Sequence, residues 1–407
     1  MKRFHRAWAV CLGCTLMLLV SGGLCINAFS VTQPFILAQN GFTNTQTSMI
    51  TSVRSVTYLL GMFFTTFYYK RIGYRLGMTL SAVLGAASFA LFAAAKTLGG
   101  YYLAGAIAGM SYGFGSMVPA TILMMRWFRS HRAMAVGLCS AGTGLATVAF
   151  SPVLTMLIEK YSLRTCFLFE SAFCLAAAAL VFLLVRADPM SCGSEPYGTA
   201  VPESPQLRAL HDIHPSPVRW VMLYLSMAFL GAIAGPGFSH MMINFTTAGF
   251  SSAAAARAVS IFGFMLMAGK CAYGIVCDGL GAPRTNRIFG AALLLGIGGC
   301  VLVCFKSTAL MYLSAVLYGV GVPLNTVGMS IWATDFSPPE LISRRVQRFQ
   351  LYYAIGTLIF SFMPGAIADL TGSYAPAFAV LLVFGVFSLL VVQSTYRLCT
   401  KTGAGCR

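Results

Sequence analysis

Residues 269–287 read GKCAYGIVCDGLGAPRTNR, where a long apolar run comes to its end. The run occupies about residues 253–276, which is long enough to cross a bilayer as a helix. Lys270 lies inside it, and Asp278 follows where polar residues return. A cation within lipid is costly unless protein or a water-filled cavity surrounds it. The stretch therefore predicts a membrane-spanning helix with a functional lysine near one end and a short polar loop after it.

The composition of the 407-residue chain excludes an ordinary soluble protein. The chain is 58% hydrophobic and 9% charged, with a formal net charge of +17. A soluble domain carries about 25% charged residues, so this chain lacks the polar surface that water requires. An excess of Lys and Arg is typical of the cytoplasmic loops of multispanning proteins, and we therefore expect no nucleic-acid partner. The 13 cysteines stand mostly alone in apolar runs, which favours buried thiols over metal or redox chemistry.

Twelve apolar stretches have the length of a membrane-spanning helix. They lie near residues 7–29, 46–68, 76–95, 98–123, 133–157, 164–185, 219–244, 253–276, 286–305, 308–331, 349–369 and 375–396. The first follows basic residues, as in a signal peptide, but lacks a small-residue cleavage site, and we interpret it as a helix of the protein. Short alternating segments do not occur, so we expect an all-α membrane protein with twelve transmembrane helices.

Lys and Arg are concentrated in alternate loops. With the N-terminus inside the cell, the inner loops and termini hold most of these cations. The outer loops hold Lys96, Lys160, Arg164, Arg257 and Lys306. This asymmetry predicts that both termini are cytoplasmic. The short termini favour a bacterial inner membrane, and we expect a monomer surrounded by the lipid bilayer.

A polar stretch at 186–218 divides the spans into two sets of six. It is rich in proline and contains Asp188, Glu195, Glu203 and Asp212. Such a composition is typical of a solvated, flexible cytoplasmic linker. We therefore expect an N-terminal six-helix bundle at 1–185 and a C-terminal six-helix bundle at 219–407. This is the layout of transporters built from two repeats around a site near the middle of the membrane.

The opening stretch has a partial copy in the first half of the chain. It runs from Thr66 to Arg75, after the second span. When Gly281 is aligned with Gly73, Asp278 stands opposite Lys70. The match falls at corresponding loops of the two halves, which favours an internal repeat.

These loops carry a family resemblance. Gly274, Asp278, Gly281 and Arg284 resemble the G-x-x-x-D-x-x-G-x-[R/K] signature of the major facilitator superfamily, with one extra residue before the arginine. The first-half copy keeps Gly73 and Arg75 but has a lysine in place of the acid. The resemblance implies two pseudo-symmetric six-helix bundles that alternate access to a substrate site. It also implies that these six residues form gating loops.

A narrower resemblance concerns the oxalate/formate antiporters and monocarboxylate porters. Residues 126–137, with their Arg-Trp-Phe start, are similar to that group's entry to the fifth helix, and 363–374 to its end of the eleventh. Lys270 occupies the position of the eighth-helix cation that binds the substrate carboxylate in this group. Oxalate-type members carry a second cation in the eleventh helix, where Ile355 stands here. The resemblance therefore implies one carboxylate rather than two.

Two cations within spans are candidate substrate ligands. Lys270 is interpreted as the counter-charge of an anionic substrate; the alternative is a lysine whose amine reaches the cytoplasmic headgroups. Arg54 lies near the middle of span 46–68 and binds a second anionic group or gates the outer side; if the span starts later, it is a headgroup anchor.

Other polar residues within spans are weaker candidates. They either contact substrate or, as the alternative, form hydrogen bonds between helices, and they are Asn27, Asn325, Tyr58, Tyr112, Tyr273 and Tyr318. Glu170 is a deep acid in the sixth span, either a proton carrier or a partner for a neighbouring helix.

The function predicted from these features is secondary active transport of a small organic anion, most plausibly a monocarboxylate. A proton or a counter-anion would be the coupled ion. The alternatives are a transporter of a neutral or drug-like solute and a membrane sensor that does not transport. No nucleophile–base pair, metal cluster or nucleotide motif occurs, so we expect neither enzymatic activity nor a cofactor.

Overall fold

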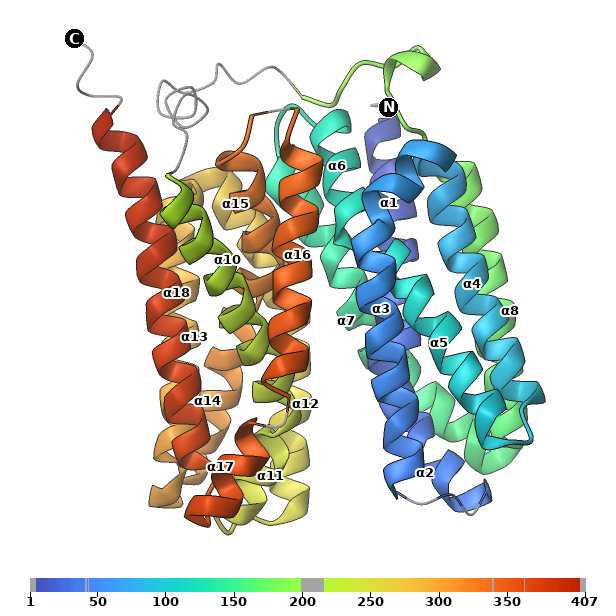
Figure 1. Ribbon diagram of the computed structural model, residues 1–407, viewed down its shortest axis with the longest axis vertical. Helices are drawn as coiled ribbons and strands as arrows, with labels where there is room; N and C mark the ends of the chain where they lie inside the picture. Colours follow the sequence, from blue (N-terminus) through green and yellow to red (C-terminus); the bar gives the residue numbers. More distant parts are fainter. Residues whose placement is uncertain are drawn as a thin grey trace. The chain divides into compact units, whose positions relative to one another are not determined.

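The computed structural model describes residues 5–40, 42, 44–198, 216–338, 340–361 and 363–402. Within this part the chain is almost entirely helical, and an isolated bridge between Phe128 and Tyr197 is its β-type pairing (Figure 1). Residues 199–215 of the predicted linker lie outside the described residues.

The helices of the first half of the chain are α1 (Arg6–Leu18), η1 (Leu19–Ala28), α2 (Phe29–Asn40), α3 (Asn44–Ile72), α4 (Tyr74–Ala94), α5 (Leu98–Phe114), α6 (Met117–Trp127), α7 (Arg132–Lys160), α8 (Leu163–Leu184) and η2 (Met190–Cys192). Those of the second half are α10 (Pro217–Ala232), η3 (Ile233–Gly237), α11 (Met241–Thr247), α12 (Ser252–Leu280), α13 (Ala282–Val301), η4 (Leu302–Phe305), α14 (Thr308–Gly321), η5 (Leu324–Gly328), α15 (Met329–Asp335), α16 (Ile342–Ile359), α17 (Met363–Thr371) and α18 (Ala375–Thr402).

Eleven helical stretches of the described residues are long and apolar enough to cross a membrane. They coincide with eleven of the twelve predicted spans. The remaining predicted span, 46–68, falls on α3, a helix of 29 residues that has a more polar composition because it carries Arg54 among several hydroxyl side chains. The all-helical membrane architecture predicted from the sequence is confirmed.

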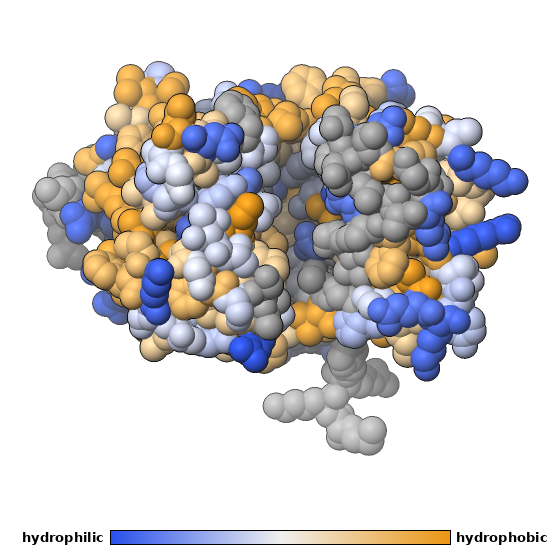
Figure 2. All heavy atoms as spheres, turned by 90° about the horizontal axis from the view of Figure 1, so that it is seen from below, coloured by the Kyte–Doolittle hydropathy of each residue, from blue (hydrophilic) through white to orange (hydrophobic). Residues whose placement is uncertain are grey.

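The surface is rich in large apolar side chains, as expected of helices that face lipid. Figure 2 shows many of them in the end-on view, mixed with hydrophilic ones. Strongly exposed examples are Phe63, Phe67, Leu183, Leu295, Val383 and Leu390. A soluble monomer rarely exposes so much apolar surface.

The chain divides into two compact units, each with its own packing. The first comprises residues up to 129 together with 138–198, and the second comprises 130–137 together with the chain from 199 onward. In the first, α3 packs on α5 and α4 packs on α8; in the second, α12 and α13 pack on α14, and α10 packs on α16 and α18. The first turn of α7 therefore belongs with α12, which no sequence pattern indicated.

Equivalent helix pairs in the two units approach each other closely at glycine. On α5, a side chain at Gly109 would collide with the Arg54 carbonyl of α3. On α14, a side chain at Gly319 would collide with the Phe262 carbonyl of α12. Small residues at such crossings let the backbones touch, as is typical of membrane helices.

The first, fourth, seventh and tenth spans depart from regular α-helix near their middle. The first contains the π-helical segment η1, the seventh contains η3, and the tenth contains η5. The fourth breaks between α5 and α6 at Gly115 and Ser116. The eleventh is also interrupted, between α16 and α17. Such irregular turns free backbone carbonyls and occur often at functional sites, so they direct attention to these helices.

Candidate functional site

Arg54 is buried inside the first unit. Its side chain, in α3, is 9% exposed. The Nη1 atom donates to the carbonyl of Cys25 in η1 at 3.0 Å, and the guanidinium lies 4.8 Å from the centre of the Phe29 ring. A headgroup anchor would expose its guanidinium, so this placement favours the site interpretation over the alternative.

A polar surface adjoins Arg54 in the same unit. Tyr58, one turn along α3, stacks on Tyr112 with ring centres 4.5 Å apart. A side chain at Gly22 would meet both Tyr112 and Thr143, so these two side chains converge over η1. Asn27 is exposed and donates from Nδ2 to the Thr143 carbonyl at 3.3 Å. The structure therefore brings Asn27, Arg54, Tyr58 and Tyr112 together, and adds Thr143, which the sequence did not single out.

Lys270 is buried in the second unit, with 6% of its surface exposed. The second turn of α7 lies directly against this part of α12, because a side chain at Gly137 would collide with the Lys270 carbonyl. A lysine that reached the headgroups would expose its amine, so burial favours the counter-charge interpretation. Its role in binding stays a prediction.

Tyr318 and Asn325 are both fully buried and bind backbone. The Tyr318 hydroxyl donates to the Ile233 carbonyl at 2.6 Å, and Asn325 Nδ2 donates to the Leu230 carbonyl at 3.2 Å. Both acceptors flank the point where α10 gives way to η3, where the irregular turn leaves carbonyls available. These bonds favour the helix-to-helix alternative for both residues in this conformation.

The two predicted gating loops have the same backbone geometry. Gly73 ends α3 with φ 80° and ψ 164°, and Gly281 ends α12 with φ 78° and ψ 157°. Each glycine is followed directly by the next helix. Only glycine adopts this region without strain, which explains why both loops keep it. The alignment of the two halves is thereby supported by conformation as well as by sequence.

Asp278 caps the start of α7. Its Oδ1 accepts from the Ala133 N–H at 3.0 Å and its Oδ2 from the Met134 N–H at 2.7 Å. The first turn of α7 has no acidic residue of its own, and a carboxylate from elsewhere satisfies N–H groups that a helix start leaves unpaired. Gly274 permits this approach, because a side chain there would collide with the Ala133 carbonyl.

The corresponding loop of the first half makes different contacts. Lys70, opposite Asp278 in the repeat, is exposed. Arg75 donates from Nε to the Phe182 carbonyl at 2.8 Å and stacks on the Phe182 ring. Arg284 is exposed. The second loop therefore holds a helix start through its acid, while the first holds α8 through its arginine.

The start of the predicted linker is attached to the first unit. Tyr197 packs against His5, Trp8 and Phe128, and its backbone pairs with the chain around Phe128. Trp127 Nε1 donates to the Arg186 carbonyl at 2.9 Å. The Arg-Trp-Phe motif thus anchors the linker, a role that the sequence did not reveal.

Comparisons with known proteins agree with this architecture. A family model described as Major Facilitator Superfamily matches residues 14–344. Monocarboxylate transporter 12 of Xenopus laevis is 23% identical over 91% of this chain and 84% of its own length. Monocarboxylate transporter 13 of Rattus norvegicus is 23% identical over 76% of this chain and 70% of its own length.

Solved structures show the same fold. The proton:xylose symporter XylE matches with a TM-score of 0.73 at 13% identity, covering 94% of both chains. The human organic anion transporter MFSD10 matches with a TM-score of 0.70 at 16% identity, covering 95% of this chain and 99% of its own. The fold class predicted from the sequence, two six-helix bundles, is confirmed.

Proposed function

Because the chain belongs to the major facilitator superfamily and is a multi-pass membrane transporter, we propose that it carries a small organic anion with one carboxylate. The observation that supports this most is Lys270, a lysine buried in a membrane-spanning helix. Charged residues in such places are costly and mark substrate or ion pathways. The names of the relatives, monocarboxylate transporters, agree with this substrate class.

The preference for one carboxylate follows from the eleventh span. Ile355 in α16 stands where the resemblance to oxalate-type members would place a second cation, which would neutralise a dianion. A dicarboxylate would then bring one carboxylate into the site without a counter-charge, at a considerable desolvation cost. Arg54, on the polar surface of the first unit, supplies the additional contact to the substrate.

The transport cycle uses the cap on α7 as a gate. The Asp278 carboxylate holds the first turn of α7 against α12 in the conformation described here. Release of these two hydrogen bonds would free the start of α7 and permit the other conformation. We place both termini in the cytoplasm of a bacterial cell, with the protein a monomer in the inner membrane and a proton or counter-anion as coupled ion.

Thermal-shift measurements on the purified protein test this function. Ligands that bind the native state raise the melting temperature. We expect formate, acetate, pyruvate or lactate to stabilise the protein, and oxalate or malonate to have little effect. Stabilisation by the dianions alone would contradict the proposal.

Flux into proteoliposomes separates the remaining alternatives. A transporter accumulates the labelled monocarboxylate that stabilises it, whereas a sensor binds without flux. Uptake of neutral solutes together with a lack of any carboxylate effect would favour the neutral-substrate alternative.

A further inference from the structure

Glu170 is a carboxyl group that the site described above does not use. It lies in α8 and is 0% exposed. Neither of its oxygens has a hydrogen-bond partner among the described residues. The salt bridge found among the described residues joins Arg126 and Asp188, and Glu170 takes no part in it. An ionised carboxylate would be very costly in such a place, so Glu170 is a neutral acid in this conformation and holds a proton.

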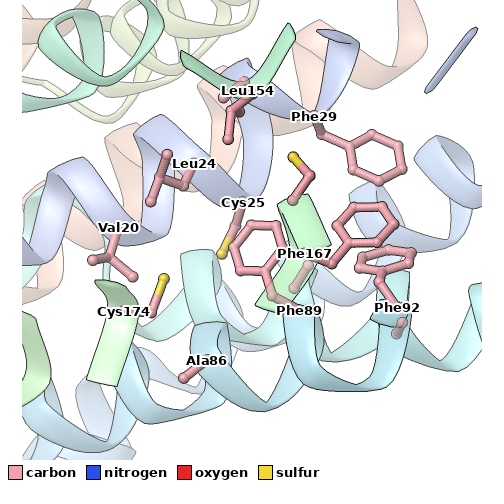
Figure 3. Close-up of a cluster of buried hydrophobic side chains, with 14 of the residues drawn as sticks. Val20, Leu24, Cys25, Phe29, Ala86, Phe89, Phe92, Leu154, Phe167 and Cys174 are labelled. Atoms are coloured by element: carbon pink, nitrogen blue, oxygen red, sulfur yellow. The ribbon is translucent and has the colours of Figure 1, made fainter. Parts of the chain in front are cut away.

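Three thiols lie within electrostatic range of Glu170. Cys166 and Cys174 lie one turn before and after it on the same face of α8, and Cys25 of η1 lies within electrostatic range of it. Figure 3 shows Cys25 and Cys174 in a cluster of buried side chains that also includes Phe89 of α4. None of these groups stabilises a carboxylate.

Charged residues on the neighbouring elements are directed elsewhere. α8 packs on α4, α1, α2 and η1. In α1, Arg6 is exposed; in α4, Arg75 binds the Phe182 carbonyl. η1 and the described part of α2 contain no charged residue. Among the described residues, the titratable groups found within electrostatic range of Glu170 are the three thiols.

Cys25 connects this acid to the candidate site. Its thiol lies near Glu170, while its backbone carbonyl accepts the hydrogen bond from Arg54. Cys25 belongs to η1, a π-helical segment. Rearrangement of such a segment would move its carbonyls and side chains together. It would therefore change the hydrogen bond from Arg54 to the Cys25 carbonyl, and it would also change the packing that keeps water away from Glu170.

Resting on the function proposed above, we propose that Glu170 is the proton-binding residue of a proton–carboxylate symport. In the described conformation the proton is bound to a carboxyl oxygen. When η1 moves and water enters, the O–H bond breaks and the proton passes to water, leaving a carboxylate. Protonation from the opposite side restores the neutral acid. One proton and one substrate anion then cross in each cycle, and no net charge is moved.

Substitution by glutamine tests the proposal because it imitates the protonated acid. Glu170→Gln and Glu170→Leu are reconstituted in proteoliposomes with the best monocarboxylate of formate, acetate, pyruvate and lactate. In a one-proton symporter, a gradient of one pH unit drives accumulation of up to about tenfold. We expect both variants to keep substrate exchange within about twofold of wild type but to lose accumulation driven by the pH gradient. Glu159→Gln, at an exposed acid of the same unit, is the control and should behave as wild type.

Three results would overturn the proposal. If Glu170→Gln accumulates substrate with the pH dependence of wild type, the acid is structural and the proposed transport function stands. If wild-type accumulation does not respond to the pH gradient, the proton role falls and the transport function again stands. If wild type exchanges none of the four monocarboxylates, both fall.

A measurement on the wild-type protein covers the case in which the variants do not fold. Glu170 is the buried glutamate among the described residues. Infrared spectra of protein labelled with ¹³C-glutamate should show a protonated carboxyl band at neutral pH. In D₂O this band shifts as deuterium replaces the carboxyl proton. We expect this exchange to become faster when substrate is added, because turnover lets water reach Glu170. Absence of this band, or exchange that substrate does not accelerate, would contradict the proposal.

Discussion

Lys270 illustrates how much one residue reveals in an apolar chain. Its position within a spanning segment is visible in the sequence, and the structure shows that it is buried. Tyr318 and Asn325 had the same kind of support from the sequence, yet both bind backbone carbonyls in the core. Polarity within a span therefore identifies candidates, but only the fold separates binding groups from hydrogen bonds between helices.

The first prediction at this scale concerns Lys270→Ala. Loss of one partner of a buried charge interaction costs about 2 kcal/mol or more, so we expect uptake of the monocarboxylate to fall about 30-fold or further. Uptake by proteoliposomes with matched amounts of protein measures this. Lys96→Ala, at an exposed lysine in the loop between α4 and α5, should retain wild-type uptake. Undiminished transport by Lys270→Ala would rule out its counter-charge role.

A second prediction at the residue scale adds the missing cation. Ile355→Lys should let the protein accept malonate or oxalate, because a charge-assisted contact contributes about 1.5 kcal/mol or more. We expect the ratio of dicarboxylate to monocarboxylate affinity to rise about tenfold. Thermal shift and competition measure the ratio, with Ile355→Met as the control for side-chain volume. An unchanged ratio would mean that Ile355 does not face the substrate.

At the scale of elements, helix ends and helix crossings decide the arrangement. α12 and the first turn of α7 meet where Gly137 and Gly274 leave room, and Asp278 supplies the acceptors that the start of α7 lacks. Asp278 and Gly274 were visible in the sequence as parts of a loop motif. Their partner was not, because it lies more than a hundred residues away in the chain.

Gly274→Ala tests this contact, and α12 contains its own control. The new methyl group would collide with the backbone of α7, and overpacking of this kind costs about 1–3 kcal/mol. We expect a lower melting temperature and reduced transport. A side chain at Gly279, on the same helix, would meet nothing within 4 Å, so Gly279→Ala should be neutral or slightly stabilising. Equal effects of both changes would show that helix propensity, not packing, is responsible.

At the scale of the whole molecule, the chain forms two units with separate packing. The first part of the linker, up to residue 198, is held by Tyr197 and Trp127. The proline-rich composition of residues 186–218 predicts a solvated linker that packs on neither half of the chain. Aromatic contacts with the first unit bind this segment nevertheless, and such contacts depend on where α1 begins and α6 ends.

A split protein tests the independence of the units. Two fragments that divide the chain within 199–215 should restore transport when they are expressed together, because each then contains a whole set of six predicted spans. Division at the loop around Lys96 should not, since it separates α4 from α5 inside one packed unit. Uptake in cells that produce both fragments measures the outcome. Equal recovery from both divisions would contradict the assignment of the units.

The sequence by itself determined the class of protein, the helices and the internal repeat. A long apolar run in lipid forms a helix, because its backbone N–H and C=O groups must then bond to one another. Gly73 and Gly281 reflect a local backbone conformation that only glycine adopts without strain. Tertiary structure decided which polar residues meet. The cap of Asp278 on α7, the bond from Arg54 to Cys25 and the isolation of Glu170 all join distant segments. Their geometry depends on helix packing, which hydrophobic pattern alone does not specify.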